Sequence, residues 1–95
     1  MTKHDDDNAW FHFLNMCTEF KTASEFKEFF DLFLTLEEKQ DLARRFLLVK
    51  ELLQGNKTQR EIAKDLSLSI SKITRGSNAL KVVRDSLREF LKNHI

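Results

Sequence analysis

The residues best suited to chemistry lie in residues 58–81, a segment predicted to form two short helices joined by a turn. The second helix carries hydroxyl, amide and cationic side chains, which hydrogen-bond to base edges and phosphates of DNA. Residues 57–84 contain seven Lys or Arg and two acidic residues, a net charge of +5. This charge favours DNA binding over a merely solvated basic helix face. The polar residues concerned are Ser71, Lys72, Thr74, Arg75, Ser77 and Asn78.

Local signals position these two helices. Thr58 and Glu61 have the spacing of a capping box, which predicts a helix from Gln59. Ser69 is predicted to cap the second helix. This is the pattern of a helix-turn-helix, whose second helix enters the major groove of DNA. The residues expected to point inward are Ile62, Ala63 and Leu66 on the first helix, and Ile70, Ile73 and Leu80 on the second.

Composition predicts one soluble, all-α domain. The chain has 95 residues, no Pro and two Gly, which argues for helices throughout. Its single cysteine, Cys17, excludes an intrachain disulfide and fits a reducing cytoplasm. We find neither a signal peptide nor an apolar run of about 18 residues, so we expect a cytoplasmic protein without a membrane partner. Residues 1–35 have a net charge of −4 and residues 36–95 a net charge of +5, which assigns DNA contacts to the C-terminal part.

The N-terminal third is rich in phenylalanine. Seven of the nine Phe precede residue 34, in helices expected over 9–21 and 24–33, while residues 1–8 are expected to fray. Two short helices cannot bury this much aromatic surface between themselves. We therefore predict a homodimer that covers it. A Phe-lined ligand pocket and a surface that docks another protein are the alternatives.

Two further helices complete the predicted domain. Residues 34–55 should form the longest helix, with a capping box at Thr35 and Glu38 and a stop at Gly55. Residues 85–95 should form a last helix capped by Asp85. The predicted single domain, 1–95, thus contains a dimerisation arm over 1–33, a core helix over 34–55, a helix-turn-helix over 58–81 and a C-terminal helix. The inward stripe of the core helix is predicted to be Leu42, Phe46, Val49 and Leu53, with Ala43 and Leu52 beside it.

Enzymatic chemistry has little support in the sequence. No Ser/His/Asp or Cys/His set has a recognisable signature, and there is no Gly-rich phosphate loop. A lone cysteine and three scattered histidines suit no zinc motif. We therefore expect no enzyme, no enzyme cofactor and no metal site.

One segment resembles a known family. The run ITRGSNALK at 73–81, preceded by TQREIA at 58–63, strongly resembles the tryptophan-responsive Trp repressors of bacteria. The resemblance is close from about Leu34 to Leu91 and loose before it. It implies six helices per chain, an intertwined homodimer and L-tryptophan as corepressor. It also implies binding to palindromic operators of tryptophan biosynthesis or uptake genes, with recognition helices about 34–36 Å apart.

The resemblance also implies a set of ligand contacts. The indole of L-tryptophan would lie between Arg45 and Arg75, and Arg75 would pair with its carboxylate. Gly76 would let the ligand approach the backbone closely. Ala79 replaces a serine that commonly helps to hold the ligand ammonium. That ammonium would also bind the carbonyls of Leu32 and Leu34 of the second chain, with Thr35 nearby.

The implied DNA contacts are Gln59, Arg60, Ile70, Ser71, Lys72, Thr74 and Lys81. Ala79 keeps an alternative open, because the lost hydroxyl would weaken the hold on tryptophan. This alternative is a DNA-binding regulator of the same fold that is independent of tryptophan or senses another indole-like ligand. The pair formed by Arg45 and Arg75 argues against it.

Overall fold

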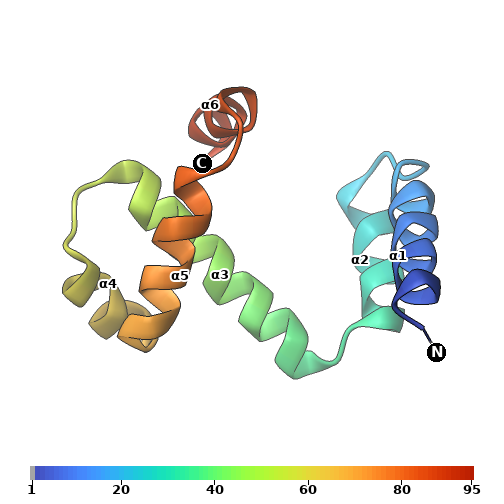
Figure 1. Cartoon of the computed structure of the whole chain (residues 1–95), viewed down its shortest axis with the longest axis horizontal. Coiled ribbons are helices and arrows are strands. Elements are labelled where there is room, and N and C mark those ends of the chain that lie inside the picture. Colours follow the sequence, from blue (N-terminus) through green and yellow to red (C-terminus); the bar gives the residue numbers. More distant parts are fainter. Residues whose placement is uncertain (1) are drawn as a thin grey trace. The chain divides into compact units, whose positions relative to one another are not determined.

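A computed structural model describes residues 2–95, which contain six α-helices and no β-strand (Figure 1). The chain divides into two compact units, Met1–Leu36 and Glu37–Ile95. The prediction of an all-α chain with six helices is confirmed. Whether the two units behave as a single domain stays a prediction. The helices are α1 (Lys3–Cys17), α2 (Ala23–Phe33), α3 (Leu36–Gln54), α4 (Gln59–Leu66), α5 (Ile70–Lys81) and α6 (Asp85–His94).

Helix α1 begins six residues before its predicted start and ends at Cys17 instead of at residue 21. A capping box explains the early start: the Asp5 N–H donates to Thr2 Oγ1 at 3.2 Å, and the Thr2 N–H donates to Asp5 Oδ2 at 3.4 Å. The expectation that residues 1–8 fray is therefore wrong for residues 3–8, while Met1 lies outside the described residues. The first-turn carboxylates also face the positive end of the helix dipole.

Aromatic rings join α1 to α2 within the N-terminal unit. The Phe13 ring lies 5.1 Å from that of Phe29 and meets the ring of Phe33 edge-on at 5.3 Å. The rings of Phe20 and Phe29 are 4.8 Å apart. Even so, neither helix contains a fully buried residue, and Phe11 is 64% exposed. The aromatic rings of this unit therefore pack against one another, but much of their surface remains exposed to solvent.

Helix α3 begins directly after Thr35 and ends before Gly55, as predicted. Gly55 has a φ of +69°, the left-handed conformation that ends many helices. The predicted inward stripe is wrong within the chain for Leu42 and Phe46, which are 58% and 54% exposed, whereas Val49 and Leu53 are partly buried. The buried residue of α3 is Leu48, because α4 and α5 cover that side of the helix.

The helix-turn-helix packs on Leu48. Ile62 from α4 and Ile73 from α5 join it in a core in which each side chain is at most 1% exposed. Partly buried apolar residues complete this cluster, namely Leu52, Ala63, Leu66 and Leu68. Ile73 points inward as predicted, whereas Ile70, expected inward, is 51% exposed. Ile70 is the first residue of its helix and does not join the core cluster.

Helix α6 begins at Asp85, but the cap position belongs to Arg84, which makes no side-chain cap hydrogen bond. The prediction that Asp85 caps this helix is therefore wrong by one residue; Asp85 lies in the first turn. Arg88 connects α6 to the preceding helix by donating from Nη2 to the Leu80 carbonyl at 2.6 Å. This hydrogen bond joins α6 to the last turn of α5.

Candidate functional site

A pocket of about 350 Å³ lies between α3 and α5 in the C-terminal unit. Its apolar residues are Leu48, which belongs to the core, and Leu68, in the turn before α5. The remaining lining is charged. It consists of Asp41, Arg44, Arg45, Lys72 and Arg75.

Helical periodicity explains how these residues meet. Asp41, Arg44, Arg45 and Leu48 follow one another at spacings of three, one and three residues, so they share one face of α3. On the other wall, Lys72 and Arg75 are three residues apart on α5, and Leu68 precedes Lys72 by four. The pocket is therefore formed by two facing helical stripes, with an apolar end at Leu48.

The pocket has a net charge of +3, from four cationic side chains and the carboxylate of Asp41. In residues 2–95 no ion pair or side-chain hydrogen bond joins any two of these five residues. The guanidinium groups are free to pair with an external anion, and carboxylates match their geometry best. An apolar end and a cationic rim suit a ligand that has an apolar body and a carboxylate.

Two of the predicted ligand residues, Arg45 and Arg75, line this pocket together. Gly76 and Ala79 are not part of the lining. Gly76 is buried instead, and it packs against Leu48. The predicted contacts of Leu32, Leu34 and Thr35 would come from a second chain; these residues belong to the N-terminal unit.

The residues predicted to contact DNA lie at the start of α4 and along α5, and each of them is exposed. They are Gln59, Arg60, Ile70, Ser71, Lys72, Thr74 and Lys81. Lys72 was assigned to DNA alone, but it also lines the pocket. Ser71 and Thr74 lie outside the lining. Helix α5 thus presents some side chains to the pocket and others to solvent.

Several pocket residues were not identified from the sequence. They are Asp41, Arg44, Leu48 and Leu68, to which the sequence analysis assigns no role. The spacing of Asp41, Arg44, Arg45 and Leu48 on one helix face is the signal that could have found three of them. No comparable signal exists for Leu68, because the turn decides where its side chain points.

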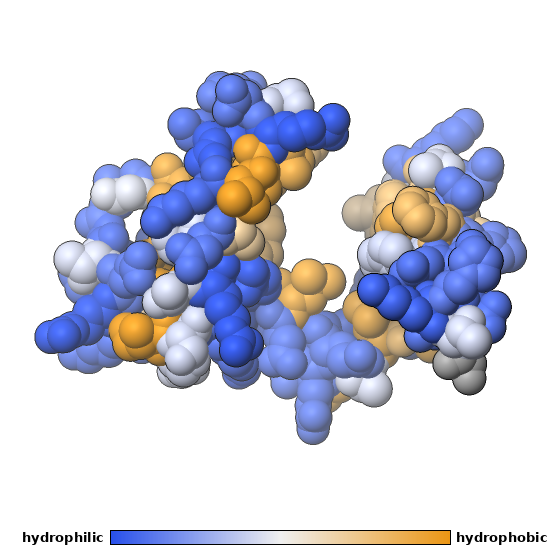
Figure 2. Space-filling model, in the orientation of Figure 1, coloured by the Kyte–Doolittle hydropathy of each residue, from blue (hydrophilic) through white to orange (hydrophobic). Residues whose placement is uncertain are grey.

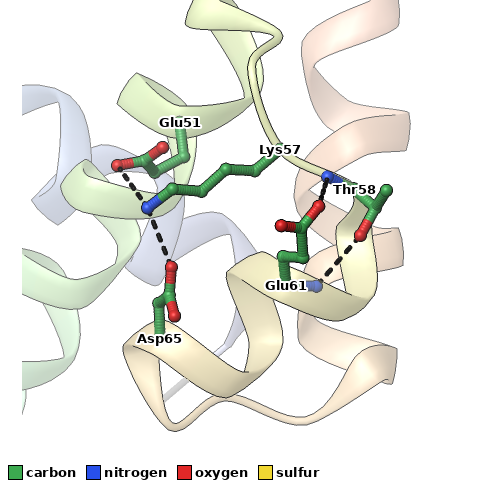
Figure 3. Close-up of polar contacts among 5 residues, drawn as sticks. All are labelled: Glu51, Lys57, Thr58, Glu61 and Asp65. Atoms are coloured by element: carbon green, nitrogen blue, oxygen red, sulfur yellow. Dashed lines mark hydrogen bonds and ion pairs between the residues drawn. The ribbon is translucent and has the colours of Figure 1, made fainter.

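Local polar contacts hold α4 in position (Figure 3). The predicted capping box forms: the Glu61 N–H donates to Thr58 Oγ1 at 3.1 Å, and the Thr58 N–H donates to Glu61 Oε1 at 3.0 Å. The hydrogen bonds from the Thr58 backbone and side chain lower the pKa of Glu61. The start of α4 therefore lies where the sequence placed it.

Lys57 joins α4 to α3 (Figure 3). Its Nζ lies 2.8 Å from Asp65 Oδ2 and 3.7 Å from Glu51 Oε1. The hydrogen bond to Asp65 raises the pKa of Lys57 above its ordinary value. Any stabilisation from this contact is present below the unfolded-state pKa and is lost as pH rises through the folded-state pKa.

The turn between α4 and α5 depends on one unusual backbone conformation. Ser67 has φ 54° and ψ 44°, the left-handed region that costs a side-chain-bearing residue free energy. Its N–H and that of Leu68 donate to carbonyls at the end of α4. Ser69 then caps α5 as predicted, since its Oγ accepts from the Lys72 N–H at 3.2 Å.

Within residues 2–95 no helix is both long and apolar enough to cross a membrane. The same residues contain no group of three or more His, Cys, Asp or Glu side chains that could hold a metal ion.

The fold and the site define a helix-turn-helix protein with a cationic pocket beside its second helix. The family model described as Trp repressor protein matches residues 8–95. The chain therefore belongs to the Trp repressor family, a family of transcription regulators. The recognised run at 73–81 forms most of α5, the helix that carries Arg75.

Relatives agree over nearly the whole chain. The chain is 48% identical over 93 residues to the Trp operon repressor homolog of Chlamydia caviae, a match that covers 98% of this chain and 92% of the relative. It is 40% identical to the protein of the same name from Chlamydia trachomatis serovar D, covering 98% and 99%. The Haemophilus influenzae homolog is 34% identical over 86 residues, covering 90% and 85%.

Proposed function

We propose that the chain is a sequence-specific DNA-binding repressor that binds palindromic operators as a homodimer when L-tryptophan is bound as corepressor. Its targets would be tryptophan biosynthesis or uptake genes. The protein would act in the cytoplasm. One observation carries the proposal: α5 contributes Arg75 to a cationic pocket, while Ser71 and Thr74 of the same helix remain exposed outside it. A ligand in the pocket would therefore act directly on the helix that reads DNA.

The pocket chemistry supports L-tryptophan as the ligand. Guanidinium planes stack on aromatic rings and pair with carboxylates in two parallel hydrogen bonds, and Arg45 and Arg75 provide both interactions. Leu68 is partly buried and adds apolar surface for an indole, whereas Leu48, at 1% exposure, adds little. A volume of about 350 Å³ is at the small end of the range for ligand pockets, as suits a single amino acid.

Exposed apolar surface supports the homodimer. In the N-terminal unit Trp10 is 57% exposed, and both α3 and α6 expose large apolar side chains as well. Figure 2 shows apolar side chains at the surface of both units. A soluble monomer rarely leaves this much apolar area in water, and a second copy is the simplest cover. Helices α1 and α2 would interlock with those of the partner, whose Leu32 and Leu34 carbonyls would then receive the ligand ammonium.

The dimer would also provide the geometry for DNA binding. Two copies of α5, related by the two-fold axis, would enter successive major grooves about 34–36 Å apart. Gln59 and Arg60, in the first turn of α4, would contact phosphates, and Ser71 and Thr74 would contact base edges. Ligand contacts to Arg75 would favour the arrangement of α5 that fits this spacing.

The test is selection of binding sites from random duplex DNA with the full-length protein, with and without L-tryptophan. We expect palindromic sites to be enriched with tryptophan and much less without it. Equal enrichment in both conditions would exclude tryptophan as corepressor. No enrichment in either condition would contradict DNA binding itself. Sedimentation over a range of protein concentrations measures the dimer in parallel, and a monomer that leaves its apolar surface exposed would instead favour a module that docks another protein.

A second function has one observation in its favour. Ala79 offers no polar side-chain atom to the ligand ammonium, and the rim has two cations, Arg44 and Lys72, besides the two predicted arginines. A regulator of the same fold that is independent of tryptophan, or that senses another indole-like ligand, is the alternative. The comparison of DNA binding with and without L-tryptophan distinguishes the two.

A further inference from the structure

Asp41 is the one carboxylate among the lining residues of the pocket, where it lies among four cationic side chains. It is exposed, and its carboxylate makes no ion pair or hydrogen bond within the part of the chain that the structure describes. An aspartate four residues before an arginine on a helix commonly pairs with it, yet Asp41 and Arg45 are not paired here. The carboxylate is therefore available to a ligand.

The position of Asp41 along α3 gives the pocket lining a direction along the helix axis. At a rise of about 1.5 Å per residue, Asp41 lies about 6 Å along the helix axis from Arg45 and about 10 Å from Leu48. The lining of α3 thus changes from apolar to cationic to acidic over two turns. An aromatic amino acid has the matching three parts, which are an apolar side chain, a carboxylate and an ammonium group.

We propose that Asp41 accepts a hydrogen bond from the α-ammonium group of the bound amino acid and so selects zwitterionic ligands over purely anionic aromatic acids. The proposal rests on the proposed function and adds a specificity-determining residue to it. An ammonium group has three N–H donors, and a carboxylate is the strongest acceptor that a side chain can offer. Without Asp41 the pocket would have a net charge of +4 and would favour the anion.

Two ligands that differ in the ammonium group isolate this role. L-tryptophan and indole-3-propionate share the indole and the carboxylate, and only the first has the ammonium. Calorimetric titration of both into the whole chain would compare the wild type with Asp41→Asn and Asp41→Glu. Glu37→Gln is the matched control, because it removes the same charge from an exposed position on α3 outside the pocket lining.

We expect Asp41→Asn to weaken L-tryptophan binding by about fivefold or more, since a charge-assisted hydrogen bond is lost. Indole-3-propionate should bind equally well or more tightly, because the mutation removes a negative charge near its carboxylate. Asp41→Glu should recover most of the loss. Glu37→Gln should change neither ligand by more than about twofold, as expected for an exposed charge outside the pocket.

Two other results would overturn the inference. If Asp41→Asn weakens both ligands equally, Asp41 affects the pocket without distinguishing the ammonium group. If it weakens neither, Asp41 has no role in the pocket. Both results leave the proposed function intact, because the wild type still binds L-tryptophan. A wild-type protein that binds no L-tryptophan would contradict the proposed function and this inference together.

Discussion

A methyl group at Gly76 would lie 2.7 Å from Cδ2 and 3.3 Å from Cγ of Leu48. The two residues therefore set how closely α5 approaches α3. Leu48 also lines the pocket. The absence of a side chain at Gly76 thus has a packing role in the chain itself, separate from the close approach of a ligand that the family resemblance implies.

We expect Gly76→Ala to destabilise the protein by about 1–3 kcal/mol, because Leu48 is 1% exposed and has little room to move. This outcome opposes the gain of about 1 kcal/mol that alanine brings to a helix interior. Denaturant unfolding measures it. Asn78→Ala, on the exposed side of α5, is the control for helix propensity.

A double-mutant cycle tests the mechanism. If the cost of Gly76→Ala comes from Leu48, it should largely disappear in a Leu48→Ala background. Additive costs would show that another contact is responsible.

The turn conformation at Ser67 gives a second prediction. Ser67→Gly should stabilise the protein by about 0.5–1 kcal/mol, because glycine adopts a positive φ without the steric cost that serine bears. Ser67→Val, with a branched β-carbon, should destabilise it. Thermal unfolding of the three proteins should rank them Gly, Ser, Val. Any other order would mean that the turn relaxes away from this conformation.

Glu61 gives a pH dependence. Its pKa is lowered in the folded state by the hydrogen bonds from Thr58, so it stabilises the fold above its unfolded-state pKa. That stabilisation is lost as pH falls through the folded-state pKa. Unfolding measured between about pH 3 and pH 7 should therefore show a smaller acid loss in Glu61→Gln than in the wild type. Parallel curves for the two proteins would rule out this contribution.

Lys72 gives a prediction about salt. It is exposed on α5 and is predicted to approach DNA, so it should release about one counterion on binding. Lys72→Gln should lower the slope of log affinity against log salt by about one unit. Lys64→Gln, which removes an exposed charge from α4, should leave the slope unchanged. Because Lys72 also lines the pocket, affinity for L-tryptophan must be measured alongside.

Local chemistry made much of the fold predictable. The capping box of Thr58 and Glu61, the cap at Ser69 and the stop at Gly55 depend on a few neighbouring residues, and each lies where the sequence indicated. The start of α1 was missed although Thr2 and Asp5 have the same capping spacing as Thr58 and Glu61.

Packing between helices was harder to predict. The apolar residues of α3 fit two overlapping faces, and sequence spacing could not decide between Phe46 and Leu48. The choice is made by α4 and α5, which cover Leu48 and leave Phe46 exposed. The prediction that Ile70 points inward was wrong for a similar reason: sequence spacing does not show whether the first residue of a helix is covered by the neighbouring helix.

The candidate site was predictable in part. Arg45 and Arg75 were named through a family resemblance, and the pocket brings them together. Asp41 and Lys72 were not assigned to the pocket. They line it because α3 and α5, which are far apart in the sequence, face each other there.

We propose two roles for α5: Arg75 binds the ligand and Thr74 reads DNA. The measurement is the affinity of Arg75→Ala and Thr74→Ala for L-tryptophan and for a selected operator, with and without tryptophan. We predict that Arg75→Ala loses tryptophan binding and the tryptophan response, because it removes the pocket guanidinium. Thr74→Ala should bind tryptophan normally but bind the operator more weakly. Equal loss of tryptophan binding in both variants would contradict this division of α5.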